Sequence, residues 1–413
     1  MNNRLLAVLM SVILAILAVE CRAEPDLDDD PHPINVSTTS VPTQVSATTG
    51  SQLGNFSDDG LYRTISGYLQ IRPICVPALT SSVVTIPPAL RSVPVETIIQ
   101  DHPAPLVVLL LGISGQASSD STKLCAKACA DAGYHVLTFD STFRPEMAGI
   151  LNRGVSGNIW AETEAVADII NAYVTTSPHK AKFTKIGVVG MSYGGVEALI
   201  LGNLQTAGKL PFKIDAIQAY SPPIDMRNTA VILDDWYNAE RWKYTLIELY
   251  RRVAKYKPES GAPLSPSIMR AAIAASFQRE LAPVVLKNDK QFHLGQFSEG
   301  DATLREEEAG QWGFTRFAYE MTMPWWRQRL GGNRIEELIE QTRLDNLLKN
   351  QPPCTEAMIS VDDPFNTPAD IQSVQSVEPK LPLTLLKSGG HLGYLTEPWV
   401  KDKLQSLFEC GTK

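Results

Sequence analysis

The sequence predicts an α/β protein with a mainly parallel central sheet, helices on both faces of the sheet, and a helical insertion at one edge. From Leu106 onward, short continuous apolar runs typical of buried strands alternate with longer helix-like segments. The alternation stops between Asp225 and about Gln351, where the pattern is helical. Gly190–Gly194, Gly-Met-Ser-Tyr-Gly, lies between one strand-like run and the helix-like run that follows it. These three observations fix the predicted fold class.

The first residues have the pattern of a secretory signal, which we assign to residues 1–23. Arg4 precedes an apolar run that ends at Val19, and the small residue Ala23 follows shortly after. The run is short for a membrane span, and its length and flanks are typical of a cleaved signal. We therefore expect an exported protein, periplasmic or secreted, with an uncleaved membrane anchor as the alternative.

Residues 24–60 contain seven acidic residues and no Lys or Arg, and they are rich in Ser, Thr and Pro. Such a segment buries too little apolar surface to offset its ordering entropy, so we predict a disordered tether. The rest, residues 61–413, is long enough for one large domain with an insertion. The net charge of −8 and the lack of a basic stripe argue against a nucleic-acid partner.

The six cysteines give no sign of a metal site. None has Cys-x-x-Cys or Cys/His ligand spacing, and the chain lacks glycine-rich nucleotide motifs, so we expect no metal and no cofactor. Cys21 could carry a lipid, although Glu20 before it is a poor fit because such sites prefer a small residue there. The predicted topology would bring Cys354 and Cys410 to the same edge, where a disulfide is geometrically reasonable.

The core elements follow one another in strand–helix order. The strand-like runs are Leu106–Leu111, His135–Phe139, Lys185–Val189, Ala216–Tyr220, Met358–Val361 and Leu383–Leu386. The helix-like segments are Lys123–Ala132, Ala161–Val174, Val196–Leu201, a short one near Asp370, and Pro398–Phe408. Because the strands are continuously apolar rather than alternating, the sheet should be covered on both faces.

The insertion, residues 226–351, is expected to form a helical cap over the sheet edge at which the core strands end. Trp242, Leu246 and Leu249 recur at helical spacing, as do Ile335 and Leu338. The insertion contains five of the seven tryptophans: Trp236, Trp242, Trp312, Trp325 and Trp326. We assign Trp325 and Trp326 to an apolar substrate pocket, the alternative being that the aromatic residues form the small core of the cap.

Gly190–Gly194 is a candidate nucleophile elbow with Ser192 as the nucleophile. Its glycines let strand and helix approach closely, while the serine occupies a strained turn above the sheet edge. The N–H of Tyr193 is the first expected oxyanion donor. The second should come from the loop Gly112–Gly115, with Ile113 N–H the better candidate. A simple glycine turn is the alternative for that loop.

A serine hydroxyl needs a base within hydrogen-bond reach and a group that orients the base. Among six histidines, His391 alone lies in a glycine-rich loop directly after the last predicted strand, at the same edge as the elbow. The acid is expected after the strand that ends at Val361, where Asp362 and Asp363 follow. We choose Asp363 because an apolar residue and a proline follow it in the turn. Asp225, after the preceding core strand, is the alternative.

Five motifs together resemble the α/β-hydrolase superfamily. They are Leu-Gly-Ile-Ser-Gly at 111–115, Gly-Met-Ser-Tyr-Gly-Gly at 190–195, Ser-Pro-Pro-Ile-Asp at 221–225, Val-Asp-Asp-Pro-Phe at 361–365 and Gly-Gly-His-Leu-Gly at 389–393. The branch that they resemble most contains bacterial YheT-type hydrolases and mammalian ABHD lipases. The resemblance implies the α/β-hydrolase fold and a carboxylic-ester hydrolase with Ser192 as nucleophile, His391 as base and Asp363 as acid.

We therefore expect an exported serine esterase or lipase-like hydrolase that acts on a small-molecule or lipid ester through an acyl-enzyme. Peripheral membrane contact stays open, and the sequence does not predict the oligomeric state. A peptidase or an acyltransferase with the same triad is one alternative, because the triad serves all three reactions. An inactive binding protein on a hydrolase scaffold is the other.

Overall fold

The computed structural model describes residues 56–71, 79–87, 91–151, 153–240, 265–297, 301–331 and 334–409. All of them belong to one compact unit of the chain, Pro42–Lys413. The predicted signal, residues 1–23, and most of the predicted tether lie outside these residues, as do Trp242 and the residues that follow it up to 264.

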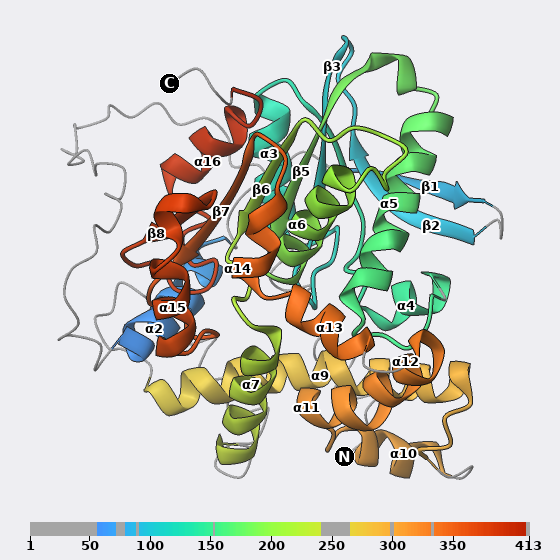
Figure 1. Cartoon of the computed structure of the whole chain (residues 1–413), viewed down its shortest axis with the longest axis vertical. Coiled ribbons are helices and arrows are strands. Elements are labelled where there is room, and N and C mark those ends of the chain that lie inside the picture. Colours follow the sequence, from blue (N-terminus) through green and yellow to red (C-terminus); the bar gives the residue numbers. More distant parts are fainter. Residues whose placement is uncertain are drawn as a thin grey trace, which may run out of the picture. The chain divides into compact units, whose positions relative to one another are not determined.

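The centre of the fold is an eight-stranded sheet with the order β1-β2-β4-β3-β5-β6-β7-β8 (Figure 1). The strands are β1 (Thr80–Ile86), β2 (Arg91–Ile98), β3 (Ala104–Leu110), β4 (His135–Thr138), β5 (Phe183–Met191), β6 (Ala216–Tyr220), β7 (Thr355–Ser360) and β8 (Leu383–Leu386). β2 is antiparallel to both β1 and β4, and every other pair is parallel. The predicted mainly parallel sheet is confirmed.

The sequence prediction missed β1 and β2. Their side chains alternate between exposed and buried, as Val93 and Val95 do with Pro94 between them. The hairpin closes one edge of the sheet and buries only one of its faces, so it lacks the continuous apolar runs that reveal the central strands.

Helices cover both faces of the sheet, as predicted. Along β3, Leu106, Val108 and Leu110 face one hydrophobic core, whereas Val107 and Leu109 face another. The helices of the first face are α5 (Ile159–Thr176), α6 (Tyr193–Thr206), α14 (Leu344–Leu347) and α15 (Pro368–Gln375). Those of the second are α3 (Asp120–Asp131) and α16 (Pro398–Gln405).

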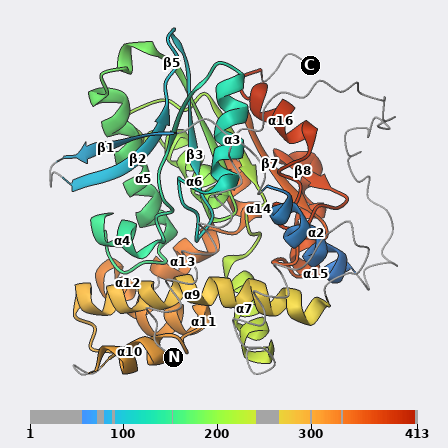
Figure 2. The same cartoon turned by 180° about the vertical axis from the view of Figure 1, so that it is seen from behind.

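The described parts of the insertion after β6 are helical, and those between 226 and 341 lie together at one edge of the sheet (Figures 1 and 2), whereas α14 packs on the first face. The helices are α7 (Met226–Glu240), α9 (Pro266–Phe292), α10 (Ala302–Ala309), α11 (Phe314–Phe317), α12 (Met323–Leu330) and α13 (Arg334–Gln341). The longest, α9, begins where Ser265 caps the N–H of Ile268 and Pro266 occupies the first turn. It ends at His293, whose backbone is left-handed.

The remaining helical elements of the described residues are short. They are α4 (Pro145–Leu151), η1 (Lys180–Lys182), η3 (Ala318–Thr322), η4 (Leu348–Asn350) and η5 (Glu378–Lys380). Within the described ranges, no helix is both long enough and apolar enough to cross a bilayer.

Helix α2 (Phe56–Gln70) corrects the predicted end of the tether. Residues 56–60 were assigned to the tether because of their composition, but they form the first turn of this helix. Its acidic residues Asp58 and Asp59 lie near the positive end of the helix dipole, which stabilises them there. Leu61 and Ile65, one turn apart, pack against Met269 of α9. Gly60 and Gly67 of α2 lie against the backbone of Asp362 and Gly393, in the segments that follow β7 and β8.

Candidate active site

Ser192 lies at the turn between β5 and α6, with φ 54° and ψ −117°. A positive φ is strained for a residue other than glycine. The two glycines of the motif permit the turn: a Cβ on Gly190 would lie 2.1 Å from the carbonyl oxygen of Gly194. A Cβ on Gly194 would lie 2.4 Å from the backbone of Leu110. The result is a partly exposed serine at the carboxyl edge of the sheet.

Ser192, His391 and Asp363 form one hydrogen-bonded chain. The distance from His391 Nε2 to Ser192 Oγ is 2.9 Å, and that from His391 Nδ1 to Asp363 Oδ2 is 2.8 Å. Because the buried carboxylate can only accept, Nδ1 carries the proton and Nε2 is left to accept from the serine hydroxyl. The second carboxylate oxygen, Asp363 Oδ1, accepts from the N–H of Phe365 at 2.9 Å. The structure thus brings together the three residues that the sequence singled out.

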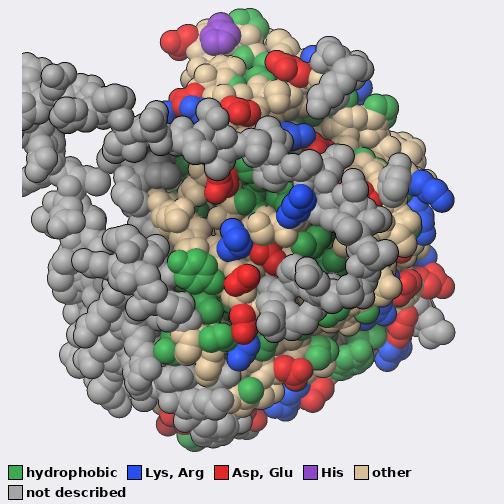
Figure 3. Space-filling model, turned by 90° about the vertical axis from the view of Figure 1, so that its left-hand side faces the viewer, with side chains coloured by type: hydrophobic (Ala, Val, Ile, Leu, Met, Phe, Trp, Pro, Cys, Tyr) green, Lys and Arg blue, Asp and Glu red, His purple; other side chains and the backbone are tan. Residues whose placement is uncertain are grey.

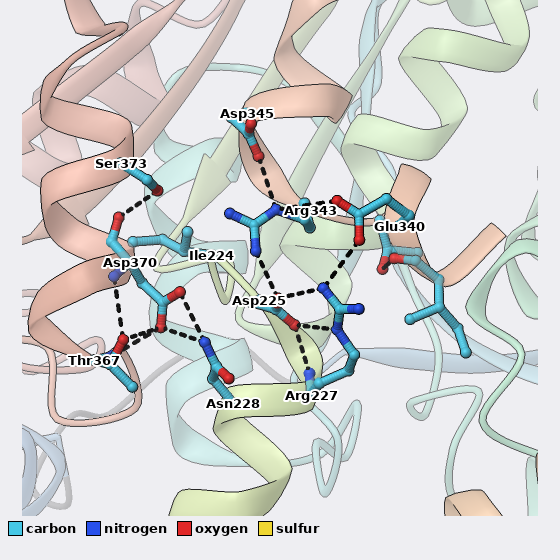
Figure 4. A network of polar contacts seen from close by, with 12 residues as sticks. Ile224, Asp225, Arg227, Asn228, Glu340, Arg343, Asp345, Thr367, Asp370 and Ser373 are labelled. Carbon is cyan, nitrogen blue, oxygen red and sulfur yellow. Dashed lines mark hydrogen bonds and ion pairs between the residues drawn. The ribbon is translucent and has the colours of Figure 1, made fainter. Parts of the chain in front are cut away.

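Asp225, the alternative acid, is occupied elsewhere (Figure 4). Its carboxylate accepts from Arg227 and from Arg343, each at 2.7 Å. Burial opposes ionisation, but the bonds and charges of these two arginines outweigh it and lower the pKa of Asp225. Asp225 therefore ties the start of the insertion to its end and is not the partner of His391.

The two segments predicted to supply oxyanion donors flank Ser192. A Cβ on Gly112 would lie 3.4 Å from Ser192 Cβ and 3.8 Å from its Oγ, so the loop after β3 runs beside Ser192. The N–H of Gly115 donates to the carbonyl of Gly112 at 2.7 Å and closes this turn. Tyr193 begins α6, where amide groups have no acceptor within the helix. Ile113 and Tyr193 thus lie on the two segments that border Ser192 Oγ.

Beneath the elbow is a buried acidic cluster that the sequence analysis missed: Glu162, Glu197, Thr142 and Tyr193. The hydroxyl of Thr142 donates to Glu197 at 2.6 Å, and that of Tyr193 donates to Glu162. The N–H of Gly157 also donates to Glu162, at 2.7 Å. Burial raises the pKa of Glu162, and it raises that of Glu197 to about 8. A glutamate in an apolar helix, such as Glu197 in Val-Glu-Ala-Leu-Ile, was the available signal.

Four phenylalanines, which we call the aromatic arc, connect the ring of His391 to the ring of Tyr193. Phe365 packs on the imidazole of His391 with ring centroids 4.4 Å apart. Phe277 of α9 contacts Phe365 at 5.7 Å and Phe314 of α11 at 6.3 Å. Phe143 continues the arc, 6.1 Å from Phe314 and 5.9 Å from the ring of Tyr193. Phe277 and Phe314, both partly exposed, are the cap's contribution.

Trp325 and Trp326, which the sequence suggested for the substrate pocket, lie elsewhere in the cap. Trp325 contacts Phe292, at the C-terminal end of α9, with ring centroids 5.3 Å apart. Trp326 Nε1 donates to the carbonyl of Val155 at 2.8 Å. Phe277 and Phe292 are about four helical turns apart on α9, a separation of about 20 Å. This placement favours a packing role for both tryptophans. The rings nearest His391 come from other residues.

The described residues contain no group of three or more His, Cys, Asp or Glu side chains arranged to hold a metal ion. Cys354 carries no disulfide, and Cys410, its suggested partner, lies outside the described ranges. Cys125 and Cys129 are buried, and burial raises the pKa of Cys125 to about 12, so its thiol stays protonated and unreactive.

The strand order, with an antiparallel second strand, accompanies a strained serine turn after β5, an aspartate after β7 and a histidine after β8, joined by hydrogen bonds. This combination decides the fold. The chain has the α/β-hydrolase fold.

Solved structures with similarity to this α/β-hydrolase chain include several esterases. An esterase of Pyrococcus furiosus is 12% identical, covers 91% of this chain and 98% of its own, and has a TM-score of 0.43. A hyperthermophilic esterase from Pyrobaculum calidifontis is 12% identical, with 84% and 91% covered and a TM-score of 0.44. The 2,6-dihydroxy-pseudo-oxynicotine hydrolase is 19% identical, with 83% and 71% covered and a TM-score of 0.41.

No family model and no curated protein sequence matches the chain. At the identities and TM-scores above, the likeness to solved structures carries no argument about activity. The resemblance to the YheT-type and ABHD branch therefore stays a prediction, and the chemistry rests on the geometry of this α/β-hydrolase site.

Proposed function

We propose that the protein is a serine hydrolase that cleaves carboxylic esters through an acyl-enzyme. The observation that carries the proposal is the chain of two hydrogen bonds from Asp363 through His391 to Ser192, 2.8 Å and 2.9 Å long. It supplies a nucleophile, a base and an orienting acid in the geometry that acyl transfer needs.

The reaction follows from these contacts. Ser192 Oγ attacks the ester carbonyl as its proton passes to His391 Nε2, and Asp363 stabilises the imidazolium that forms. The N–H groups of Ile113 and Tyr193 are the proposed donors to the oxyanion. His391 then gives the proton to the leaving alkoxide, which departs as the alcohol. A water molecule attacks the acyl-enzyme by the same route, releasing the carboxylic acid and restoring the serine hydroxyl.

The aromatic arc supports an apolar acyl group as the preferred substrate. Phe277 and Phe314 expose part of their rings between Phe365, which packs on the base, and Phe143, which packs on Tyr193. Acyl pockets are concave sites lined by apolar and aromatic side chains around a few polar groups. Here the polar groups are the triad and the two amides.

Turnover of p-nitrophenyl esters, combined with fluorophosphonate labelling, tests the proposal. Ser192→Ala and His391→Ala should each reduce kcat by about a millionfold, and Asp363→Asn by about 10⁴-fold, as in triads that act as a unit. Only Ser192→Ala should abolish the label outright. Asp225→Asn is the matched control and should keep kcat, because its carboxylate binds Arg227 and Arg343. Full turnover by Ser192→Ala would rule the mechanism out.

The other reactions of a serine triad give different results. A peptidase would turn over peptide anilides faster than matched esters. An acyltransferase would form a new ester when an alcohol is added, because the alcohol rather than water would accept the acyl group. A binding protein would neither turn over an ester nor react with the fluorophosphonate. The aromatic arc consists of four apolar rings and contributes no charged side chain, which favours an ester as the substrate.

The sequence also supports export, and we propose it on that ground alone. Protein recovered from the periplasm or the medium should begin just after Ala23 on N-terminal sequencing. A chain that retains Met1 would contradict cleavage.

A further inference from the structure

The loop that carries His391 is held by its backbone amides. The carboxylate of Asp362 accepts from two successive N–H groups, Gly389 at 3.2 Å and Gly390 at 2.9 Å. Asp362 directly precedes Asp363, and the two carboxylates have different partners. Asp363 binds the imidazole of His391, whereas Asp362 binds the backbone before that histidine. The side chain of Asp362 is 2% exposed, and burial raises the pKa of its carboxyl group.

The next two amides of the loop are bound from two other elements. The N–H of His391 donates to Thr64 Oγ1 at 2.8 Å, and that of Leu392 donates to Ser221 Oγ at 3.2 Å. Thr64 belongs to α2, and Ser221 follows β6. Four consecutive amides, 389 to 392, thus each bind a side-chain oxygen from outside the loop. A glycine-rich loop has high backbone freedom, so such contacts decide where its histidine lies.

The hydroxyl of Thr64 is oriented to accept. It donates its proton to the carbonyl of Gly60, one turn earlier in α2, at 2.7 Å. Since a hydroxyl has one proton, its lone pairs remain for the amide of His391.

Helix α2 fits the acid turn and the base loop so closely that only glycine is possible at one contact with each. A Cβ on Gly60 would lie 1.7 Å from the carbonyl oxygen of Asp362, and one on Gly67 would lie 2.1 Å from that of Gly393. Arg63, on the same helix, lies 3.6 Å from the Asp362 carboxylate. The helix therefore contacts both the acid turn and the base loop.

We propose that α2 is part of the catalytic apparatus, with Thr64 and Asp362 as positioning residues that hold His391 within reach of Ser192. The inference rests on the proposed hydrolase function. Neither residue touches the substrate; each acts through the backbone of the base loop. Displacement of a catalytic group by about 1 Å costs up to about a hundredfold in rate, so losing one of these contacts lowers kcat and leaves substrate binding unchanged.

The test compares Thr64→Val, Thr64→Ser and Asp362→Asn, with kcat expressed per active site that a fluorophosphonate can label at long exposure. Thr64→Val keeps the shape of the side chain and removes the acceptor; its kcat should fall about tenfold to a hundredfold with KM unchanged. The kcat of Asp362→Asn should fall at least as far as that of Thr64→Val. Thr64→Ser retains the hydroxyl and should restore most of the rate. Ser66→Ala, a buried hydroxyl on α2 bonded to the carbonyl of Arg63, is the matched control and should keep kcat.

The outcomes separate the two proposals. A wild-type protein that neither hydrolyses esters nor takes the label contradicts the proposed function. An active wild type whose Thr64→Val and Asp362→Asn variants keep kcat per labelled site, even if they melt at lower temperature, contradicts the positioning role alone. An equal loss in Thr64→Val and Thr64→Ser also overturns it, because the hydroxyl would then be irrelevant.

Discussion

Glu197 carries a carboxyl group that is buried beneath the turn of Ser192, and its ionisation should limit stability at alkaline pH. Burial raises the pKa of Glu197 from 4.5 to about 8. Below pH 4.5 both folded and unfolded chains keep the proton. Between these values only the unfolded chain loses it, so the free energy of unfolding falls as pH rises, and the full penalty is reached above about pH 8.

Glu197→Gln should therefore flatten the fall in stability between pH 5 and pH 9. Urea unfolding at several pH values measures the free energy of unfolding, which at pH 9 should be larger for Glu197→Gln than for the wild type. Glu164→Gln, on the exposed side of α5, is the matched control and should leave the slope unchanged. A slope that is the same in Glu197→Gln and wild type would contradict the assignment.

At the scale of elements, the cap is fastened to the sheet at its base. Asp225, before α7, binds Arg343, after α13, and the N–H of Leu344 donates to the carbonyl of Ile224 at 3.0 Å (Figure 4). Asn228 of α7 donates to Asp370, which completes the capping box of α15 with the N-cap residue Thr367. These contacts join the two ends of the insertion and connect them to the turn after β7.

Arg343→Ala should lower the free energy of unfolding by about 3 kcal/mol, because it leaves the buried carboxylate of Asp225 with only the half-exposed Arg227. Chemical denaturation measures the loss, and kcat of the folded fraction should persist. The exposed pair Arg334–Glu337 offers the control, since removing it should cost at most about 1 kcal/mol. Equal effects of the two substitutions would show that the fastening contributes nothing beyond surface charge.

The aromatic arc joins α9 and α11 to the triad, and its substitution should change specificity more than stability. Phe314→Ala enlarges the site, so the ratio of kcat/KM for butyrate and acetate esters should shift by about tenfold, the range expected for one or two methylenes in an apolar pocket. Trp326→Ala, in the cap packing near Val155, should leave that ratio unchanged and lower stability by about 3–5 kcal/mol. If instead Trp326→Ala shifted this ratio and Phe314→Ala only lowered stability, the tryptophans would line the substrate pocket.

At the scale of the molecule, the triad was predictable because each member lies in the first few residues after a strand. Ser192, Asp363 and His391 come after β5, β7 and β8, and the carboxyl ends of parallel strands meet at one edge of the sheet. Local patterns therefore sufficed to bring them together. The aromatic arc was different: Phe277 contacts Phe365, the ring that packs on His391, only because α9 crosses this edge, and no spacing in the sequence encodes that path.

The same reasoning explains the error at α2. Composition described residues 24–60 as a tether, yet Gly60 contacts the backbone of Asp362, some three hundred positions later. Tertiary contacts of this kind override a local preference for disorder. The half-exposed hairpin of β1 and β2 was missed for a related reason, since it packs on one face only.

Charge is spread evenly over the described part of the face shown in Figure 3, where acidic and basic side chains are interspersed. The expectation of no nucleic-acid partner rests on the sequence, which has a net charge of −8 and no basic stripe. A small-molecule or lipid ester remains the proposed partner.

The corrected boundary of the tether leads to a prediction about the whole chain. A protein that begins at residue 56 keeps α2 and should retain wild-type kcat and melting temperature, because the predicted tether before it buries little apolar surface. A protein that begins at residue 72 loses Thr64, whose hydroxyl binds the amide of His391, together with the packing of Leu61 and Ile65 on α9. Its kcat should fall at least as far as that of Thr64→Val, and its melting temperature should fall as well. If both truncated proteins matched the full chain in kcat, α2 would be dispensable and the domain would begin where the sequence alone had placed it or later.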